Sequence, residues 1–166
     1  MSSFKISYLK LLPIFFSPFY CHGLMAGEVG ISFRGTLIEP PPCVINNDET
    51  IYVDFGDEII TTLVDGQNYK KKIEFSLDCS STTSTSQKIR ISSTSPASFD
   101  ETSLATDING LGISLLHDGT HYNQGEWLPF EYPAVPVFEA VLIKQSGVSL
   151  NTGVFHATAS LIVDYQ

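Results

Sequence analysis

The sequence predicts an all-β protein built as a sandwich. Short segments in which apolar and polar residues alternate recur along the chain after residue 26, and this alternation is typical of strands with one buried face. Turn-forming stretches separate them at residues 64–68, 117–126 and 144–153. No long stretch has a helical period and no repeat is evident, so the strand spacing favours a sandwich over a propeller or a solenoid.

The first 26 residues are predicted to be a secretory signal peptide. Lys5 and Lys10 precede an apolar stretch from Leu11 to Tyr20, and small residues follow near Ala26. The apolar stretch is short for a membrane span and contains two prolines, so a membrane anchor is the less favoured alternative.

Removal of residues 1–26 leaves seven basic residues against 18 acidic ones, so the net charge changes from −9 to −11. A polyanion is a poor partner for nucleic acid or for an anionic membrane surface, because like charges repel. The sequence also lacks a GxSxG elbow, an HExxH motif and a phosphate-cradling glycine loop. We therefore expect no enzyme, and a small secreted hydrolase is the least favoured class.

The predicted strands follow one another along the whole exported chain. In order they cover residues 29–37, 51–55, 73–77, 87–93, 110–116, 135–144 and 155–165. Residues 80–86, SSTTSTS, form a low-complexity stretch that we interpret as a solvated loop.

Three prolines, Pro40 to Pro42, divide the exported chain into two parts. Proline cannot donate the hydrogen bonds of a strand ladder, so these residues end the first predicted strand. We expect an N-terminal extension of residues 27–38 that is detached from the domain of residues 39–166.

Cys43 and Cys79 are the two cysteines that remain after residues 1–26 are removed. An even count in an exported chain favours a disulfide. Two free thiols or a metal site are the alternatives, and the absence of a CxxC spacing makes a zinc site the weaker interpretation. A disulfide that closes a loop of this length stabilises a fold by about 3–4 kcal/mol in the chain-entropy model.

Two further groups of residues are candidates for ligand binding. His117 and His121 are four residues apart, but glycines nearby place them in a loop, where this spacing does not indicate a metal site. Tyr122, Trp127 and Tyr132 lie close together in a loop-rich segment and are candidates for stacking on a sugar. The alternative function is therefore a secreted, self-folding carbohydrate-binding β-sandwich. We expect no metal and no cofactor.

Both ends of the exported chain carry a regular alternation of apolar residues. In the last fourteen residues, GVFHATASLIVDYQ, the apolar or aromatic positions are Phe155, Ala157, Ala159, Leu161, Val163 and Tyr165. In the extension, one face holds Val29, Ile31, Phe33, Gly35 and Leu37. The last strand has no partner strand after it, and the first is cut off by prolines. Such a pair of terminal strands indicates β-strand addition between molecules.

Together these features resemble the pilin subunits that the chaperone–usher pathway of Gram-negative bacteria assembles. The resemblance covers the whole exported chain. It rests on Gly153 fourteenth from the end, the penultimate Tyr165, the cysteine pair, and Gly35 within the alternating extension. The stretches PPPCVINNDETIYVDFG and LATDINGLGISLLHDG look most like minor tip-fibre subunits, in particular the adaptor of P-type pili, although a rod subunit would share the same framework.

The resemblance implies an incomplete immunoglobulin-like sandwich of six strands that lacks the seventh. A periplasmic chaperone would supply the missing strand to the groove beside Gly153 and the alternating residues from Phe155 to Tyr165. At the outer-membrane usher, the N-terminal extension of a neighbouring pilin subunit would replace it. An adhesin is a further candidate neighbour in the fibre. The extension of this chain, from Val29 to Leu37, would be a donor strand in turn. The implied function is a structural subunit of a surface fimbria that is exported through the periplasm and contributes to cell adhesion.

Overall fold

The computed structural model describes residues 29–39 and 41–166, and these fall into two units, residues 29–37 and residues 38–166, which are described separately. The predicted signal peptide lies outside the described residues. Within residues 38–166 the regular elements are strands and two short 3-10 turns. Over the described part of the chain there is no α-helix, and no helix long and apolar enough to span a bilayer. The all-β prediction is confirmed.

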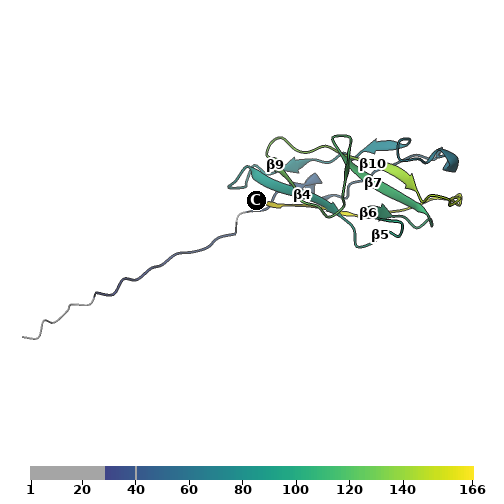
Figure 1. The fold of residues 1–166 in the computed structure, drawn as a ribbon. Coiled ribbons are helices and arrows are strands. Elements are labelled where there is room, and N and C mark those ends of the chain that lie inside the picture. Colours follow the sequence, from purple (N-terminus) through teal and green to yellow (C-terminus); the bar gives the residue numbers. More distant parts are fainter. Residues whose placement is uncertain (1–28, 40) are drawn as a thin grey trace, which may run out of the picture. The chain divides into compact units, whose positions relative to one another are not determined.

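The larger sheet contains six strands in the order β2–β10–β7–β6–β5, with β8 paired to the same strand β7 (Figure 1). The strands are β2 Lys70–Lys72, β5 Pro96–Ala97, β6 Asp100–Ala105, β7 Leu111–His117, β8 Thr120–Tyr122 and β10 Phe138–Lys144. All of its pairs are antiparallel.

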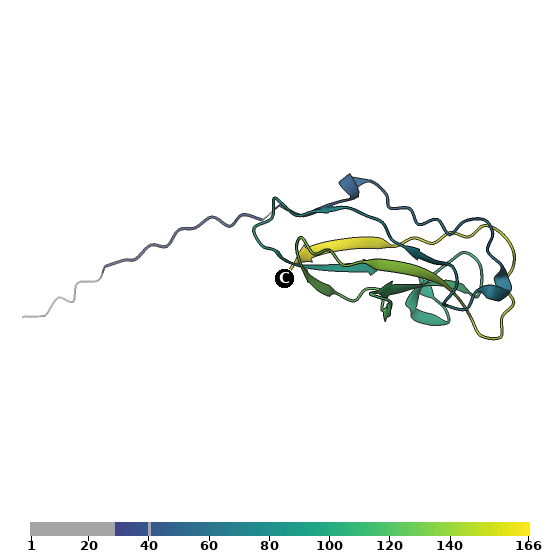
Figure 2. The same cartoon turned by 90° about the horizontal axis from the view of Figure 1, so that it is seen from above.

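The smaller sheet has the order β11–β4–β9, and a separate two-stranded ladder joins β1 to β3. The strands are β1 Val44–Ile45, β3 Leu77–Asp78, β4 Ser86–Ser92, β9 Leu128–Glu131 and β11 Ser160–Tyr165. The 3-10 turns are η1 Asn46–Asp48 and η2 Thr61–Leu63. Figure 2 shows β11 in yellow with β4 alongside it.

The two main sheets share one hydrophobic core. In β4 buried and half-buried residues alternate, and Ile89 and Ile91 face inward as the sequence pattern predicts. They join Leu115 of β7 and Leu142 of β10 in a single buried cluster. Phe138 is fully buried in the same cluster, with its ring centroid 5.1 Å from that of Tyr122. The domain is therefore a sandwich, held together mainly by burial of these apolar side chains.

Some predicted elements differ from those observed. Residues 51–55 form no ladder with any described strand, and the last strand is paired only from Ser160, because its partner β4 ends at Ser92. The predicted loop 117–126 contains β8, since Asp118 and Gly119 both have positive φ and make a tight two-residue hairpin. Strands β5, β6 and β9 are short or polar in sequence and were not predicted.

Candidate functional site: an open groove beside the last strand

Strand β11 is hydrogen-bonded to a neighbouring strand along one side only. It pairs with β4 from Ser160 opposite Ser92 to Tyr165 opposite Gln87, and it is the end strand of its sheet. Its other side presents backbone N–H and C=O groups that no ladder of the described residues satisfies. An unpaired strand edge of this kind is a template for the addition of another strand.

The side chains of the last segment keep the alternation that the sequence predicts. Phe155, Ala157, Leu161 and Val163 are partly buried and pack against the core. Ala159 lies at the next position of the same alternation but is exposed. The apolar face of this segment is thus only half covered by the domain itself.

A second segment, residues 51–59, runs opposite the last one. Val53, Phe55 and Ile59 pack against the core without belonging to any ladder of the described strands. The rings of Phe55 and Phe155 are 5.9 Å apart between centroids. At the other end, the Tyr165 hydroxyl donates a hydrogen bond to the Pro41 carbonyl. The chain from Pro41 to Ile59 and the last segment therefore run in opposite directions, with Phe55 close to Phe155 at one end and Pro41 close to Tyr165 at the other.

The two segments enclose an open groove with a volume of about 930 Å³ at its wide end. Residues 52–57 line one side and residues 150–156 the other. Val64, Ile108 and Leu111 line it between these two sides, and Val64 and Leu111 belong to the hydrophobic core. These core side chains are themselves buried, so the apolar side chains left half-covered in the groove are those of the flanking segments, such as Phe55 and Phe155.

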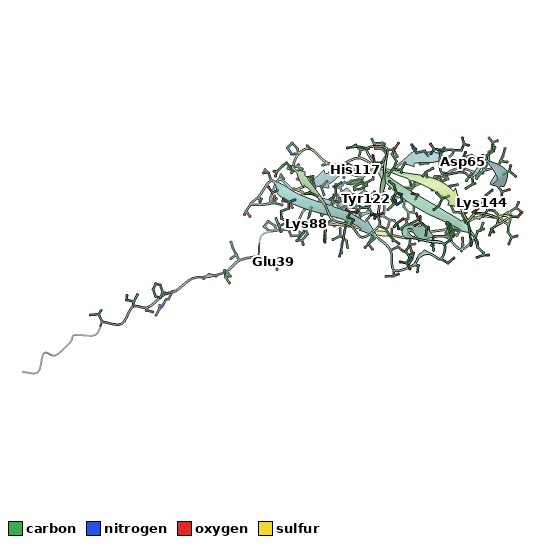
Figure 3. All side chains as sticks on the ribbon, viewed as in Figure 1. Glu39, Asp65, Lys88, His117, Tyr122 and Lys144 are labelled. Atoms are coloured by element: carbon green, nitrogen blue, oxygen red, sulfur yellow. A yellow bond between two sulfur atoms is a disulfide. The ribbon has the colours of Figure 1, made fainter. Side chains whose placement is uncertain are left out.

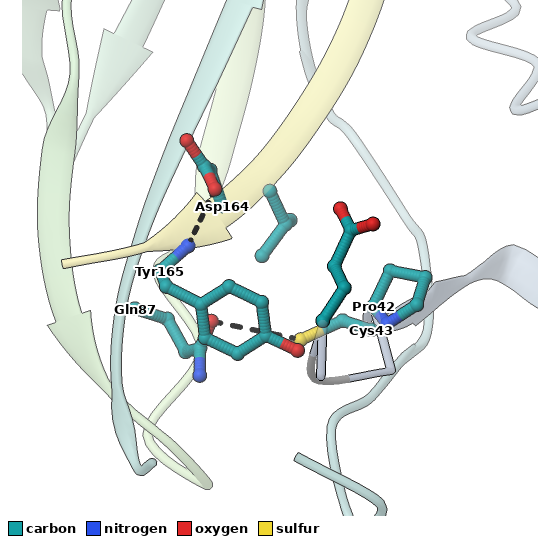
Figure 4. Close-up of a pocket in the computed structure, with 7 residues that line it drawn as sticks. Pro42, Cys43, Gln87, Asp164 and Tyr165 are labelled. Atoms are coloured by element: carbon teal, nitrogen blue, oxygen red, sulfur yellow. Dashed lines mark hydrogen bonds between the residues drawn. The ribbon is translucent and has the colours of Figure 1, made fainter. Parts of the chain in front are cut away.

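A smaller cavity of about 180 Å³ lies at the Tyr165 end (Figure 4). Cys43, Gln87 and Asp164 line it together with Tyr165. Gln87 is 1% exposed, and its Nε2 donates to the Ser84 carbonyl over 2.7 Å. Pro42 and Val163 also line this cavity, so this end of the groove combines apolar side chains with a few polar groups.

Cys43 and Cys79 form a disulfide, as predicted. Cys43 directly precedes β1 and Cys79 directly follows β3, so the bond lies at the end of the β1–β3 ladder. It ties the start of β1 to the end of β3, and residues 51–59 follow β1 and η1 along the chain. The disulfide therefore helps to fix one side of the groove.

One ion pair lies on β11 beside the groove. Asp164 Oδ2 is 3.3 Å from Lys88 Nζ of β4. The hydrogen bond from the Tyr165 backbone N–H, followed by the contact with Lys88, lowers the pKa of Asp164. Because both side chains are partly exposed, this pair contributes little to stability.

Gly153 has a φ of +147°, and a Cβ at this position would meet no atom within 4 Å. The requirement for glycine is therefore conformational, since side-chain-bearing residues rarely adopt this backbone region. This residue lies at the start of the predicted groove strand, where the chain turns into the last segment.

The predicted donor-strand residues lie in the N-terminal unit. Residues 29–37 form no strand within the described part of this unit, and the side chains of Val29, Ile31, Phe33 and Leu37 are exposed. Nothing lies within 4 Å of the position of a Cβ at Gly35. Four large apolar side chains are thus left in solvent.

The two histidines contact different neighbours. His121 contacts the hydroxyls of Ser114 and Thr102, each at 2.9 Å, and His117 lies 3.2 Å from the Val137 carbonyl. Over the described residues no group of three or more His, Cys, Asp or Glu side chains could hold an ion. His121 thus connects β8 with β6 and β7, and His117 contacts the residue that precedes β10.

The aromatic residues proposed for sugar stacking do not form one platform. Tyr122 is buried in the middle of the domain (Figure 3), and Tyr132 packs against the core. Trp127 lies against two cations, with Arg90 4.4 Å and Lys88 5.0 Å from its ring centroid. Each of the three side chains therefore already has a packing role.

Comparisons with known proteins identify relatives of the whole domain. The chain is 36% identical over 146 residues to the uncharacterised fimbrial-like protein YfcQ of Escherichia coli K12, covering 85% of this chain and 90% of that protein. It is 34% identical over 148 residues to the uncharacterised fimbrial-like protein YfcR of the same strain, covering 86% and 85%.

Two solved structures share the fold. The P pilus adaptor subunit PapF matches with a TM-score of 0.56 and 27% identity over 77% of this chain and 98% of that one. The P pilus rod subunit PapA matches with a TM-score of 0.57 and 18% identity over 82% and 100%. The sequence pattern of the fimbrial protein family matches residues 31–166. The chain therefore belongs to the fimbrial protein family, as a structural, non-enzymatic pilin subunit of chaperone–usher pili.

Proposed function

We propose that the groove between residues 51–59 and 153–165 is the site at which this subunit receives a donor strand. In this proposal the sandwich has six of seven strands, and the missing strand comes from another protein. One observation carries it: β11 has an unpaired edge, and the segment that leads into it, residues 150–156, borders an open, largely apolar groove. A donor strand would satisfy the free backbone groups and cover the half-buried apolar side chains of the groove at once.

In this proposal the backbone and the apolar side chains of the last segment have separate roles. The backbone of β11 would pair with the donor, and the side chains of Phe155, Leu161 and Val163 would contact the apolar face of the donor. Ala159 would leave room for a donor side chain, and Tyr165 would close the narrow end. A periplasmic chaperone would bind here first, and the extension of a neighbouring subunit would replace it at the usher.

The extension of this chain, residues 27–38, would serve as the donor strand for another subunit. Full burial of Val29, Ile31, Phe33 and Leu37 would contribute about 6–12 kcal/mol, at about 1.5–3 kcal/mol for each side chain. That is comparable to the whole stability of a typical domain, about 5–15 kcal/mol. The exposure of these side chains in the isolated chain supports the idea that a partner covers them.

We assign the subunit to a minor tip position, as an adaptor that links neighbours and thereby contributes to adhesion. The likeness to the adaptor PapF at 27% identity supports this place in the fibre. The predicted signal peptide would direct export to the periplasm. From there the assembled fibre would reach the cell surface.

Ala159 offers a direct test of the groove, because it is small, exposed and on the apolar face. Ala159→Glu would place a charge inside the groove without removing a core side chain. Thr158→Glu is the matched control, since its side chain is exposed on the opposite face of the extended segment. The full chain is expressed in the periplasm with its chaperone, and the co-purified complex is quantified.

We expect Ala159→Glu to abolish the complex and Thr158→Glu to leave it near the wild-type level. Equal complex yields from both variants would show that the chaperone does not bind in this groove.

A further inference from the structure

We propose that the groove selects a donor strand that carries an arginine or lysine on its outward face. The occupant is then an extended N-terminal segment of a neighbouring subunit, apolar at every second position and cationic between two of them. This inference rests on the proposed function and adds to it a chemical criterion for the partner.

The wide end of the groove has a negative charge that is not balanced within its lining. Asp54 and Asp57 are among the lining residues, and no lysine or arginine is. Neither carboxylate takes part in an ion pair within the described residues. Asp54 is held in place by the Gly56 backbone N–H, which donates to its Oδ1 over 2.8 Å.

Along residues 52–55, which form one side of the groove, half-buried apolar residues alternate with exposed ones, and Asp54 is on the exposed face. Val53 and Phe55 are partly buried against the core, whereas Tyr52 and Asp54 are exposed. A donor strand beside this segment would place its apolar side chains inward and every second side chain outward, next to Asp54. Opposite charges that face each other across neighbouring strands attract, so a cation is favoured at that outward position.

The extension of this chain shows that a donor strand of the required kind occurs in this system. Arg34 is the only charged residue between Val29 and Ile38. It falls on the face opposite Val29, Ile31, Phe33 and Leu37, between Ser32 and Thr36. An apolar inner face and one cation on the outer face are the two properties that the groove requires.

The test uses the full exported chain, purified in complex with its periplasmic chaperone. Three synthetic peptides are added in excess: residues 29–38 as they stand, the same peptide with Arg34→Gln, and the same peptide with Arg34→Glu. Replacement of the chaperone by peptide is followed by electrophoresis without boiling. We expect the rate of insertion to fall by about two- to five-fold at each step from Arg to Gln to Glu.

Salt and variants of the groove separate charge selection from other effects. In Asp54→Asn with Asp57→Asn the difference between the peptides should disappear, while the amide oxygen of the new side chain at position 54 can still accept the Gly56 hydrogen bond. Glu101→Gln with Asp118→Asn changes the net charge equally, outside the groove, and should keep the preference. High ionic strength should reduce the preference in the wild-type chain.

Equal insertion rates for all three peptides would overturn the charge criterion and leave the donor-strand groove intact. Loss of the preference in the control variant as well would also overturn it, because the effect would then follow net charge and not the groove. Failure of all three peptides to enter the groove would also overturn the inference, because a strand with both required properties would then not be accepted; the proposed function is tested separately by the Ala159→Glu variant.

Discussion

Asp100 anchors the start of β6 through three hydrogen bonds. The Ser103 and Thr102 hydroxyls each donate to its carboxylate over 2.6 Å, and the Thr102 backbone N–H donates over 3.0 Å. Burial raises the pKa of this carboxyl, but the hydrogen bonds from Ser103 and Thr102 outweigh it, so the pKa lies below its ordinary value of 3.8. The ionised form is therefore stabilised in the folded domain.

The lowered pKa of Asp100 predicts that the domain loses stability in acid. A lowered folded-state pKa contributes stability that is present above the unfolded pKa near 3.8 and is lost as the pH falls through the folded value. Asp100→Asn should therefore lose less stability than the wild type as the pH falls from above 3.8 through the pKa of Asp100 in the folded domain. Urea unfolding of the subunit bound to a donor peptide, repeated over a pH series, measures this loss. Ser103→Ala should weaken the same dependence. An identical acid loss in Asp100→Asn and wild type would contradict this role.

The disulfide gives a second prediction. Cys43 and Cys79 are 36 residues apart, and their removal should cost about 4 kcal/mol in the chain-entropy model. Cys43→Ser with Cys79→Ser should reduce the periplasmic yield strongly, without the complication of a free thiol. Mass spectrometry of the exported wild type under non-reducing conditions should find no alkylatable thiol. Two alkylatable thiols, or an undiminished yield from the double variant, would be inconsistent with a structural disulfide.

At the scale of single residues, the sequence predicted the Cys43–Cys79 disulfide from the number of cysteines and the inward-facing side chains from the alternation. It could not predict that Tyr165 reaches Pro41, 124 residues away, or that Asp100 is held by Ser103 and Thr102. The first is a tertiary contact with no local signal. The second depends on side-chain directions at the start of a strand that was itself not predicted.

Strands β2 and β11 both lie at the edge of a sheet, but only β2 carries charged residues that oppose the addition of another strand. Both end their sheets. Strand β2 consists of Lys70, Lys71 and Lys72, all exposed, and Lys71 lies between Tyr69 and Ile73 in the alternation of core-facing residues. Lysines and inward-pointing charges on an edge strand oppose the addition of another strand. The unpaired edge of β11 carries no such block on its apolar face.

We therefore expect Lys71→Val to create a second edge that competes for strands. The variant, purified with its chaperone, should form higher oligomers when the chaperone is displaced by donor peptide, as light scattering would show. Lys144→Val on β10 removes the same charge away from the β2 edge and should stay monomeric. Monomeric behaviour of Lys71→Val would mean that the lysine does not protect this edge.

Alternation predicted the inward residues of β4, β7, β10 and β11, because one face of each packs on the core. It did not distinguish a paired strand from an unpaired one, since residues 51–55 alternate but form no ladder with any described strand. Hydrogen-bond partners depend on where distant strands end. The Asp-Gly hairpin turn at Asp118 was a usable signal for β8, but it was interpreted as part of a longer loop.

At the scale of the whole molecule, the domain has the features of a strand acceptor and the extension has those of a strand donor. The domain presents an unpaired edge and an apolar groove, and the extension presents an exposed apolar face. The two alternating ends and Pro40 to Pro42 predicted strand addition between molecules, whereas the groove was an expectation from the resemblance to pilin subunits. The volume of the groove and the charge of its lining came only from the fold, since residues from separate parts of the chain form them.

The central claim is that strands pass between subunits, and one measurement tests it most directly. A variant that lacks residues 27–38 is mixed with a purified complex of the neighbouring subunit and its chaperone, and heterodimer formation is followed by electrophoresis without boiling. We expect the variant to retain its own chaperone and to form no heterodimer, and Gly35→Leu to impair formation by overfilling the acceptor groove, at about 1–3 kcal/mol. A stable heterodimer formed by the deletion variant through the neighbour's groove would contradict the account.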